Sequence, residues 1–343
     1  MIKRFASPVF DRLGIYDALL SRRVYARPGW LILMYHRVIS QQHEDPFHLG
    51  MCVSRDFFVE QIQFIRRHFT PLTVSEAMCI LRSGGTLPAN AVSVTFDDGY
   101  RDFADLALPV LRHFDCPSTL FVTTGALETG QDYWWDRVIR LVAETRASEL
   151  DISEVFPDQA SHHVSLLPAR RRSAIETLQE ALWRLSAPRI EEAIARLETL
   201  LGTPRHNESL RLNADDIARL ASVDNGDVEI AAHCITHTDL TRMSAANAFA
   251  ELQNSAMRLR DLTGRRVDGL AYPGGRNNAA VRRLADAAGF SYAVGTERGL
   301  NREPFEPFNL LRVGMPDTAV ADFKRCLGAA ALTDHPESRE AAT

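Results

Sequence analysis

The stretch "AVSVTFDDG" (Ala91–Gly99) runs an apolar, β-branched segment directly into two carboxylates and a glycine. An apolar run of this length is typical of a buried strand. Asp97 and Asp98 would therefore stand side by side at its carboxyl end. Because Asp and Gly are ordinary turn residues, a solvated turn is one interpretation. A catalytic strand end is the other, and the remaining sequence bears on the choice.

Short apolar runs alternate with longer amphipathic segments along most of the chain. Besides Ala91–Phe96, the runs that indicate strands are Trp30–Tyr35, Ser118–Thr124, Val228–Ala232, Gly269–Pro273, Ser291–Gly295 and Asn309–Gly314. The helix-like segments are one that Ser54 could cap, and others near Thr73–Arg82, Phe103–Phe114, Ala245–Leu262 and Asn278–Ala288. This alternation predicts an α/β fold with parallel strands, a distorted (β/α) barrel. Such barrels place their chemistry at the carboxyl ends of the strands.

The rhythm of strands and helices is interrupted once. From about 128 to 212 the sequence shows little strand signal and much helix, which predicts a helical insertion between two barrel strands. Residues 1–30 are predicted to form an N-terminal helical segment, residues 31–327 the main domain, and residues 328–343 a flexible C-terminal tail. The apolar residues of the N-terminal segment would dock onto the domain, or alternatively onto a membrane surface or a partner.

Composition limits the class of protein. The chain has 343 residues, of which 45% are hydrophobic and 24% charged, which is typical of a soluble globular protein. A net charge of -5 argues against a nucleic-acid binder. Five scattered cysteines without a C-x-x-C pair indicate reduced thiols. Because Asp11 and Asp17 interrupt the N-terminal apolar residues and no transmembrane-length run is present, we expect a cytoplasmic protein, with peripheral membrane association as the alternative.

A second apolar run, "VEIAAHCITH" (Val228–His237), also ends in polar groups. His233 and His237 have i, i+4 spacing, and on one helical turn such a pair can converge on a single metal. Two unrelated histidines near a turn are the alternative. The pair gains weight because it follows a strand, as the two aspartates do. One carboxylate with two imidazoles is a common ligand set for a metal that keeps open positions.

Two further strand ends carry candidate residues. In "LAYPGG", Tyr272, Pro273 and Gly274 end a strand where glycine would let the backbone approach a ligand and point an N–H at an oxyanion. A plain βα turn is the other interpretation of that stretch. In "LMYHRV", His36 follows an apolar strand. A lone histidine at a strand end is often structural or solvated.

Together these four stretches resemble the polysaccharide deacetylase family (NodB homology, carbohydrate esterase family 4). "TFDDG" looks like the first motif of that family, and "HCITH" looks like its H-[ST]-x-x-H motif. The resemblance covers most of Leu31–Val313 apart from the helical insertion. It implies a distorted (β/α) barrel for residues 31–327, and removal of N-acetyl groups from amino sugars with a divalent metal.

Residue roles follow from the resemblance. Asp97 would be the general base, and Asp98, His233 and His237 would hold the metal, expected to be Zn, with Co, Ni or Fe as alternatives. A metal on three protein ligands leaves room for water and for the acetyl carbonyl oxygen. Asp97, not bound to the metal, could take the proton of the water.

The sequence departs from the family pattern at three points. Arg312 stands where many members have the histidine that protonates the leaving amine, and a guanidinium is a poor proton donor. A subgroup acting on poly-N-acetylglucosamine-type exopolymers has its acid histidine in an N-terminal "MYH" strand, so His36 takes that role by resemblance. The third motif lacks the arginine that orients the base, a task that Arg312 could perform. Cys234 replaces Ser or Thr, either packing behind the site or serving as a thiol ligand.

Tyr133, Trp134 and Trp135 are adjacent at the start of the insertion. Aromatic rings stack on sugar faces, so Trp135 is a candidate for a glycan subsite. The alternative is that the cluster is buried within its own domain.

The leading hypothesis is a metal-dependent hydrolase that removes N-acetyl groups from an amino-sugar glycan or a glycan precursor. One alternative is a non-catalytic carbohydrate-binding relative in a polysaccharide-synthesis complex. The other is a deacylase of a lipid-linked sugar or small amide. The partner in each case is an N-acetylated sugar or amide, with a synthesis complex or a membrane surface as additional contacts.

Overall fold

The computed structural model describes residues 10–25, 29–40, 44–125, 127, 130–157, 163–202, 209–222 and 226–330. The chain forms two compact units, one of Met1–Leu127 with Leu212–Thr343 and the other of Glu128–Arg211. The first unit holds every candidate site residue except Trp135.

The first unit is built on one parallel sheet. Its strands are β1 (Leu31–Tyr35), β4 (Thr70–Pro71), β5 (Ala91–Phe96), β6 (Ser118–Val122), β9 (Val228–Ala232), β10 (Gly269–Ala271), β11 (Tyr292–Val294) and β12 (Val313–Gly314). The order is β11-β10-β9-β6-β5-β1-β12, and β4 pairs with the first residues of β5. All six residues of β5 are buried, because both faces of this central strand are covered. Each of the seven predicted strands is therefore present.

The sheet curls toward closure. An isolated parallel bridge joins Val294 at the end of β11 to Leu310, and the same segment pairs with β1 through Val313. The predicted strand Asn309–Gly314 is thus a short strand preceded by a single bridge. This curled parallel sheet with surrounding helices is the distorted (β/α) barrel that the sequence predicts.

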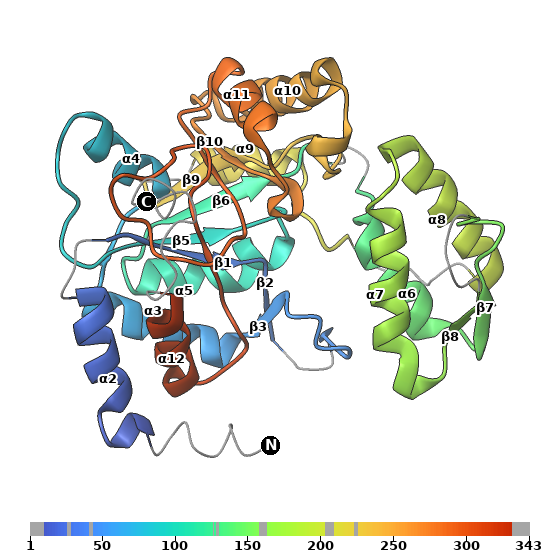
Figure 1. Cartoon of the computed structure of the whole chain (residues 1–343), viewed down its shortest axis with the longest axis horizontal. Coiled ribbons are helices and arrows are strands. Elements are labelled where there is room, and N and C mark those ends of the chain that lie inside the picture. Colours follow the sequence, from blue (N-terminus) through green and yellow to red (C-terminus); the bar gives the residue numbers. More distant parts are fainter. Residues whose placement is uncertain are drawn as a thin grey trace, which may run out of the picture. The chain divides into compact units, whose positions relative to one another are not determined.

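Helices cover the curled sheet (Figure 1). The α-helices of the first unit are α2 (Ile15–Leu20), α3 (Arg55–His68), α4 (Val74–Arg82), α5 (Leu108–His113), α9 (Ala214–Ser222), α10 (Ala245–Thr263), α11 (Ala279–Ala287) and α12 (Val320–Ala330). In the view of Figure 1, α3, α5 and α12 lie below the strands, and α10 and α11 lie above them. π-Helical turns occupy Ser21–Tyr25 and Phe103–Ala107, and 3-10 turns occupy Leu240–Arg242 and Pro273–Gly275.

The helix starts follow local sequence signals. Thr73 accepts a hydrogen bond from the Glu76 amide while Glu76 reaches back to the Thr73 amide, a capping box that begins α4. Ser54 precedes α3 as predicted, but its hydroxyl bonds Asp317 at 2.8 Å rather than the helix. The predicted helix Phe103–Phe114 begins as a π-helical turn before α5.

The two ends of the first unit pack together. α2 contacts α12, where Lys324 pairs with Asp11 and Asp17 at 2.9 and 2.8 Å, and Tyr16 and Leu20 are buried. α12 ends at Ala330, inside the stretch predicted as a tail. The remainder of that tail, and residues 1–9 and 26–28 of the N-terminal segment, lie outside the described residues. Among the residues described, no helix is long and apolar enough to cross a bilayer.

The second unit is mainly helical, with α6 (Trp134–Glu144), α7 (Arg171–Leu182), α8 (Ala187–Leu201) and a 3-10 turn at Pro168–Arg170. It also contains β7 (Glu149–Asp151) and β8 (His163–Ser165), which pair antiparallel and which the sequence reading missed. These three-residue strands are too short to give a periodic signal.

Candidate active site

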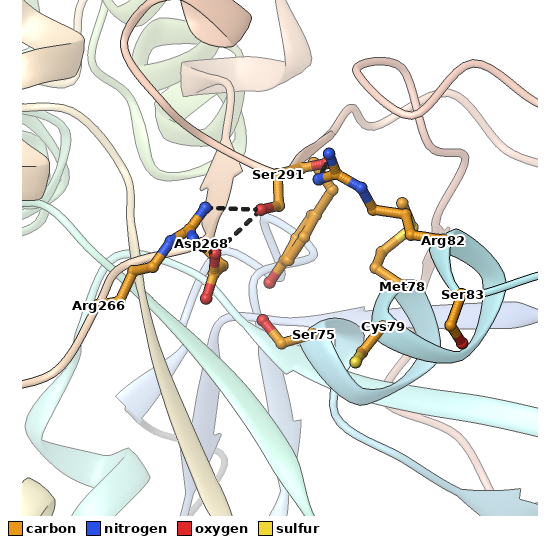
Figure 2. Close-up of a pocket in the computed structure, with 9 residues that line it drawn as sticks. Ser75, Met78, Cys79, Arg82, Ser83, Arg266, Asp268 and Ser291 are labelled. Carbon is orange, nitrogen blue, oxygen red and sulfur yellow. Dashed lines mark hydrogen bonds and ion pairs between the residues drawn. The ribbon is translucent and has the colours of Figure 1, made fainter.

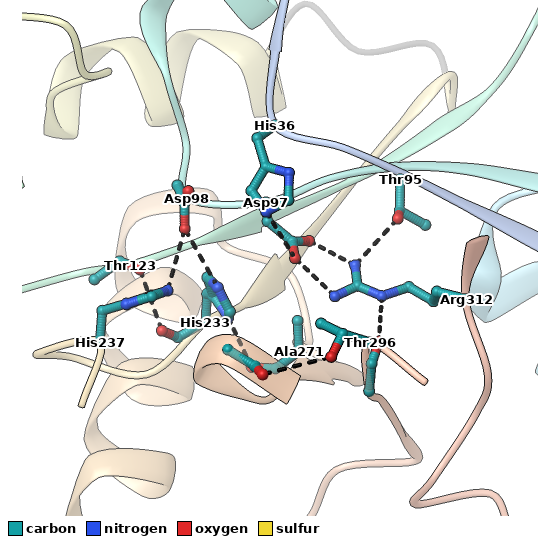
Figure 3. A network of polar contacts seen from close by, with 12 residues as sticks. His36, Thr95, Asp97, Asp98, Thr123, His233, His237, Ala271, Thr296 and Arg312 are labelled. Carbon is teal, nitrogen blue, oxygen red and sulfur yellow. Dashed lines mark hydrogen bonds and ion pairs between the residues drawn. The ribbon is translucent and has the colours of Figure 1, made fainter. Parts of the chain in front are cut away.

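Polar side chains follow three of the barrel strands directly. His36 comes after β1, Asp97 and Asp98 after β5, and His233 after β9. Because the strands are parallel, their carboxyl ends meet at one edge of the sheet, and the four side chains lie close together (Figure 3).

The two adjacent carboxylates reach the same site because the chain turns between them. The Asp97 amide still donates to the Tyr35 carbonyl at 3.0 Å, continuing the ladder of β5 with β1. Asp98 then adopts φ 75° and Gly99 φ 81°. A left-handed backbone is rare for residues other than glycine, although Asp tolerates it better than most. The turn after β5 thus begins at Asp98 itself and continues through Gly99.

Asp98, His233 and His237 form a buried cluster that fits a metal ion. Their ligand atoms all lie within 4.8 Å of one another. Asp98 Oδ1 is 3.3 Å from His233 Nε2 and 3.4 Å from His237 Nε2. His233 Nδ1 lies 2.7 Å from the Ala271 carbonyl oxygen, to which it donates, so in the neutral ring the Nε2 that faces Asp98 carries the lone pair. A lone pair facing a carboxylate favours a cation between them, and this donor set suits a divalent metal.

The local charges agree with this fit. Burial opposes ionisation of Asp98, but hydrogen bonds with His233 and His237 hold its pKa far below the ordinary value. Burial also disfavours the charged form of His233, yet in that form Nε2 can donate to Asp98, and this bond together with the charges of Asp97 and Asp98 raises the pKa of His233. Burial and the neighbouring His233 lower the pKa of His237. The cluster therefore keeps a carboxylate anion deep in the protein with a neutral imidazole beside it.

The two histidines do not lie on a helical turn. Residues 233–239 form a loop after β9, in which Cys234 has φ 63° and His237 φ 51°. The helical reading of the i, i+4 spacing is therefore wrong, although the two rings do converge, with centroids 4.7 Å apart. Cys234 is fully buried, and burial raises the pKa of its thiol well above the ordinary value. A neutral thiol packs behind the site and is a poor ligand.

Asp97 is held by Arg312 from across the barrel. The two terminal guanidinium nitrogens donate to Oδ1 and Oδ2 of Asp97, each at 2.7 Å, and Nε donates to the Gly295 carbonyl at 2.6 Å. Arg312 is fully buried. Burial alone would raise the pKa of Asp97, but the charge and hydrogen bonds of Arg312 hold it below the ordinary value. Asp97 is therefore ionised and fixed in orientation.

His36 borders both aspartates from β1. Its Nε2 is 4.0 Å from Asp97 Oδ2, and its side chain is 22% exposed, so it can meet both the buried site and solvent. The next residues, Arg37 and Val38, are bound by Asp102, which accepts from Arg37 Nε at 2.8 Å and from the Val38 amide at 3.1 Å. These bonds fix the backbone of β2 (Arg37–Ile39), which pairs with β3 (Cys52–Ser54). Burial raises the pKa of Asp102 to about 6, despite the opposing charge of Arg37.

The "LAYPGG" stretch lies beside the cluster of Asp98, His233 and His237, because the Ala271 carbonyl accepts from His233. Pro273 and Gly274 lie in a 3-10 turn, in which Gly274 has φ 58°. Tyr272 is completely buried and donates its hydroxyl to the Phe308 carbonyl at 3.0 Å. Tyr272 therefore serves the packing of the barrel wall, and only the turn after it is open to a role at the site.

Trp135 belongs to the second unit and is only 5% exposed. Its ring stacks on Tyr133 with centroids 4.2 Å apart and meets Trp134 edge to face at 5.3 Å. The cluster therefore forms part of the core of its own unit.

A pocket of about 450 Å³ opens at the opposite end of the barrel (Figure 2). Asp268 and Ser291, which line it, directly precede β10 and β11. Arg266 pairs with Asp268 at 2.8 Å and donates to Ser291 Oγ at 3.3 Å, and Ser291 Oγ also bonds Asp268. These polar groups make hydrogen bonds and ion pairs with one another. The pocket therefore offers no stronger candidate than the cluster at the carboxyl ends of the strands.

Two residues of the site region escaped the sequence analysis. Asp102 supports the strand after His36, and Glu251 of α10 accepts hydrogen bonds from the loop between the two histidines. Both lie in or next to segments with helical periodicity, where an acidic residue is most simply interpreted as part of a solvent-exposed helix face. The one signal in the sequence for Asp102 was its position five residues after Asp97, which keeps it near the end of the same strand.

Comparison with known proteins agrees with this geometry. A family model described as polysaccharide deacetylase matches residues 84–148 and 207–293. The poly-beta-1,6-N-acetyl-D-glucosamine N-deacetylase of Escherichia coli K12 is 28% identical over 117 residues, which is 34% of this chain and 17% of the relative. The same protein of Escherichia coli O157:H7 is 28% identical over 116 residues. The aligned part is thus about 17% of the length of these curated relatives.

Solved structures share the fold at low sequence identity. The deacetylase PplD of Streptococcus pyogenes, in complex with acetate, has a TM-score of 0.55 at 18% identity and covers 89% of this chain and 99% of its own. IcaB of Ammonifex degensii has a TM-score of 0.55 at 17% identity, covering 90% of this chain and 98% of its own. Residues 84–148 and 207–293 of this chain are thus similar in sequence to the polysaccharide deacetylase family, and the barrel fold agrees with that likeness.

Proposed function

We propose that this protein is a metal-dependent hydrolase that removes acetyl groups from an N-acetylated amino-sugar glycan. The observation that carries the proposal is the juxtaposition of two differently held carboxylates. Asp98 faces two imidazoles, whereas Asp97 is bound by Arg312. One carboxylate is thus available as a metal ligand and the other as a base in the same buried site.

Asp98, His233 and His237 would hold the ion, and their mixed nitrogen and oxygen donors favour zinc, with cobalt, nickel or iron as alternatives. A divalent ion there would supply Lewis acidity for the acetyl carbonyl and for the attacking water. The hydrogen bond from His233 to the Ala271 carbonyl fixes the ring tautomer that presents Nε2.

Asp97 is assigned the role of general base. Arg312 keeps it ionised, and the paired hydrogen bonds keep its carboxylate from rotating. A carboxylate with a lowered pKa accepts a proton only from an acidic donor, so it suits a water whose own pKa is lowered. Arg312 thereby replaces the arginine that the third motif lacks.

His36 is assigned the role of general acid. Its Nε2 lies 4.0 Å from Asp97 Oδ2, an oxygen that also accepts from Arg312, and its side chain is partly exposed, so a substrate arriving from solvent could reach it. The departing amine needs a proton for the C–N bond to break, and an imidazolium supplies one near neutral pH. A backbone N–H near Gly274 is proposed to stabilise the oxyanion.

We propose a polymer of β-1,6-linked N-acetylglucosamine as the first substrate to test, because the two curated relatives are named for that activity. The five cysteines all lie in the described part of the chain and form no disulfide with one another, which supports a reducing location such as the cytoplasm. We also propose that the protein contacts a polymer-synthesis complex or a membrane surface while it acts on that substrate.

The deciding experiment measures bound metal and acetate release from N-acetylglucosamine oligomers by the wild type, Asp98→Asn and His36→Ala. Asp98→Asn should lose both metal and activity, whereas His36→Ala should keep metal and lose activity. The exposed residues Asp105 and His113 supply the matched controls Asp105→Asn and His113→Ala. A wild type that binds metal but releases no acetate from any N-acetylated sugar would show the proposal to be wrong.

A further inference from the structure

The loop between the two metal-ligand candidates has an unusual backbone. Cys234 and His237 both have left-handed φ angles, 63° and 51°, within five residues. Side chains larger than hydrogen disfavour this conformation, so it persists only where the surroundings hold it. What holds this loop therefore bears directly on how His233 and His237 meet.

One side of the loop is anchored through its carbonyl groups. The amides of Thr124 and Gly125, which follow β6, donate to the carbonyls of Cys234 and Ile235 at 3.1 and 2.9 Å. A Cβ on Gly125 would lie 2.5 Å from the Ile235 carbonyl oxygen, so only glycine permits this approach.

The other side of the loop is anchored by a single side chain. Glu251 of α10 accepts from the amides of Ile235 at 2.8 Å and Thr236 at 3.0 Å through Oε2, and from the Thr236 hydroxyl at 2.8 Å through Oε1. The Thr238 hydroxyl lies 2.8 Å from that of Thr236, to which it can donate. Three donors thus converge on one carboxylate.

We propose that Glu251 is a positioning residue that sets the geometry of the metal site without touching the metal or the substrate. By binding two successive amides after the left-handed Cys234, it fixes the spacing at which His233 and His237 turn toward Asp98. The inference rests on the metal site of the proposed function, and it extends that site to α10.

A carboxylate suits this task better than other side chains. Two amides and a hydroxyl need three acceptor positions, and an ionised carboxylate offers about four. A glutamine retains one carbonyl oxygen for the two amides, while its NH₂ group faces the Thr236 hydroxyl, which can turn to accept. An alanine leaves both amides without this partner. The variants Glu251→Gln and Glu251→Ala therefore remove the hydrogen bonds to the loop in two steps, first in part and then completely.

The test measures the affinity of the full chain for Zn²⁺ by chelator competition and the absorption spectrum of the Co²⁺ form. Glu251→Ala should weaken Zn²⁺ binding by about 10–100-fold and alter the Co²⁺ spectrum, and Glu251→Gln should lose less than about tenfold. The control is Ser244→Ala, which removes the hydroxyl that caps the same helix through the Asn247 amide at 3.3 Å. It should lower the thermal midpoint while leaving Zn²⁺ affinity and the spectrum unchanged.

Wild-type Zn²⁺ affinity and spectrum in Glu251→Ala would overturn the inference, as would an equal loss of affinity in Ser244→Ala. If Glu251→Ala does not fold, Thr236→Val, which removes one of the three donors, is compared with Ser244→Ala, and an affinity equal to wild type overturns the inference. If the graded affinities appear but no variant or wild type releases acetate, the proposed function fails and the role of Glu251 stands.

Discussion

Arg312 binds both carboxylate oxygens of Asp97 at 2.7 Å, although the two residues are 215 positions apart in the chain. Both side chains are buried, so neither charge has solvent as an alternative partner. Such a pair is expensive to break, because removal of one member leaves an uncompensated buried charge. The pair therefore links the proposed acid–base chemistry of the site to the stability of the barrel.

Replacement of Arg312 should move the acid side of the pH–rate profile. Arg312 lowers the pKa of Asp97, so its loss raises that pKa and reduces the ionised fraction at a given pH. We expect Arg312→Gln to shift the acidic limb to higher pH, and the lost pair to cost about 3–5 kcal/mol of stability. Arg312→Lys should show a smaller shift, since the charge remains. An unchanged acidic limb in both variants would contradict the role of Arg312.

His36 should be required for turnover but not for metal. General acid catalysis contributes about 10²–10⁴-fold, so His36→Ala should lower kcat by that order while Zn²⁺ content stays at the wild-type level. Metal analysis and acetate release on the same preparation provide the check, with His113→Ala alongside. Full activity in His36→Ala would remove this histidine from the mechanism and leave the metal cluster untouched.

Metal removal should lower both activity and stability. An ion that binds only the folded state stabilises it by mass action, about 2.7 kcal/mol at 100 times its Kd. We therefore expect chelation to lower the thermal midpoint, added Zn²⁺ to restore it, and Asp98→Asn to show no response to Zn²⁺. A thermal midpoint of the wild type that is indifferent to chelator and to Zn²⁺ would count against the cluster as a metal site.

Glu229 of β9, which is not part of the proposed site, should make stability depend on pH. Its carboxylate accepts hydrogen bonds from Ser75, Thr119 and Tyr292, and burial raises its pKa above the ordinary 4.5. The folded state thus binds the proton more readily than the unfolded state. The free energy of unfolding should therefore fall as pH rises upward from 4.5 through the folded pKa.

Glu229→Gln should flatten that dependence, which urea unfolding at a series of pH values would measure. The exposed Glu176→Gln is the matched control and should keep the wild-type slope. Equal slopes in all three proteins would mean that Glu229 has the same proton affinity folded and unfolded.

Local pattern in the sequence was sufficient for seven of the eight strands of the barrel sheet and for most of the candidate residues. The buried run Ala91–Phe96 and its terminal aspartates, and the run Val228–Ala232 before His233, are short segments whose burial shows in their own composition. Parallel strands align their carboxyl ends, so the sequence alone predicts that the residues following these strands lie close together.

Tertiary structure alone decided how the candidate residues are held. The spacing of His233 and His237 suggested a helical turn, but the loop between them has left-handed residues. Two amides that follow β6 donate to carbonyls of this loop, and Glu251 accepts from its amides. Likewise, the partner of Asp97 comes from the segment just before β12. Hydrogen bonds between side chains far apart in sequence depend on strand order and curl, which periodicity does not encode. The sequence therefore determined which residues gather at the barrel edge, and the closing of the barrel decided which of them bind one another.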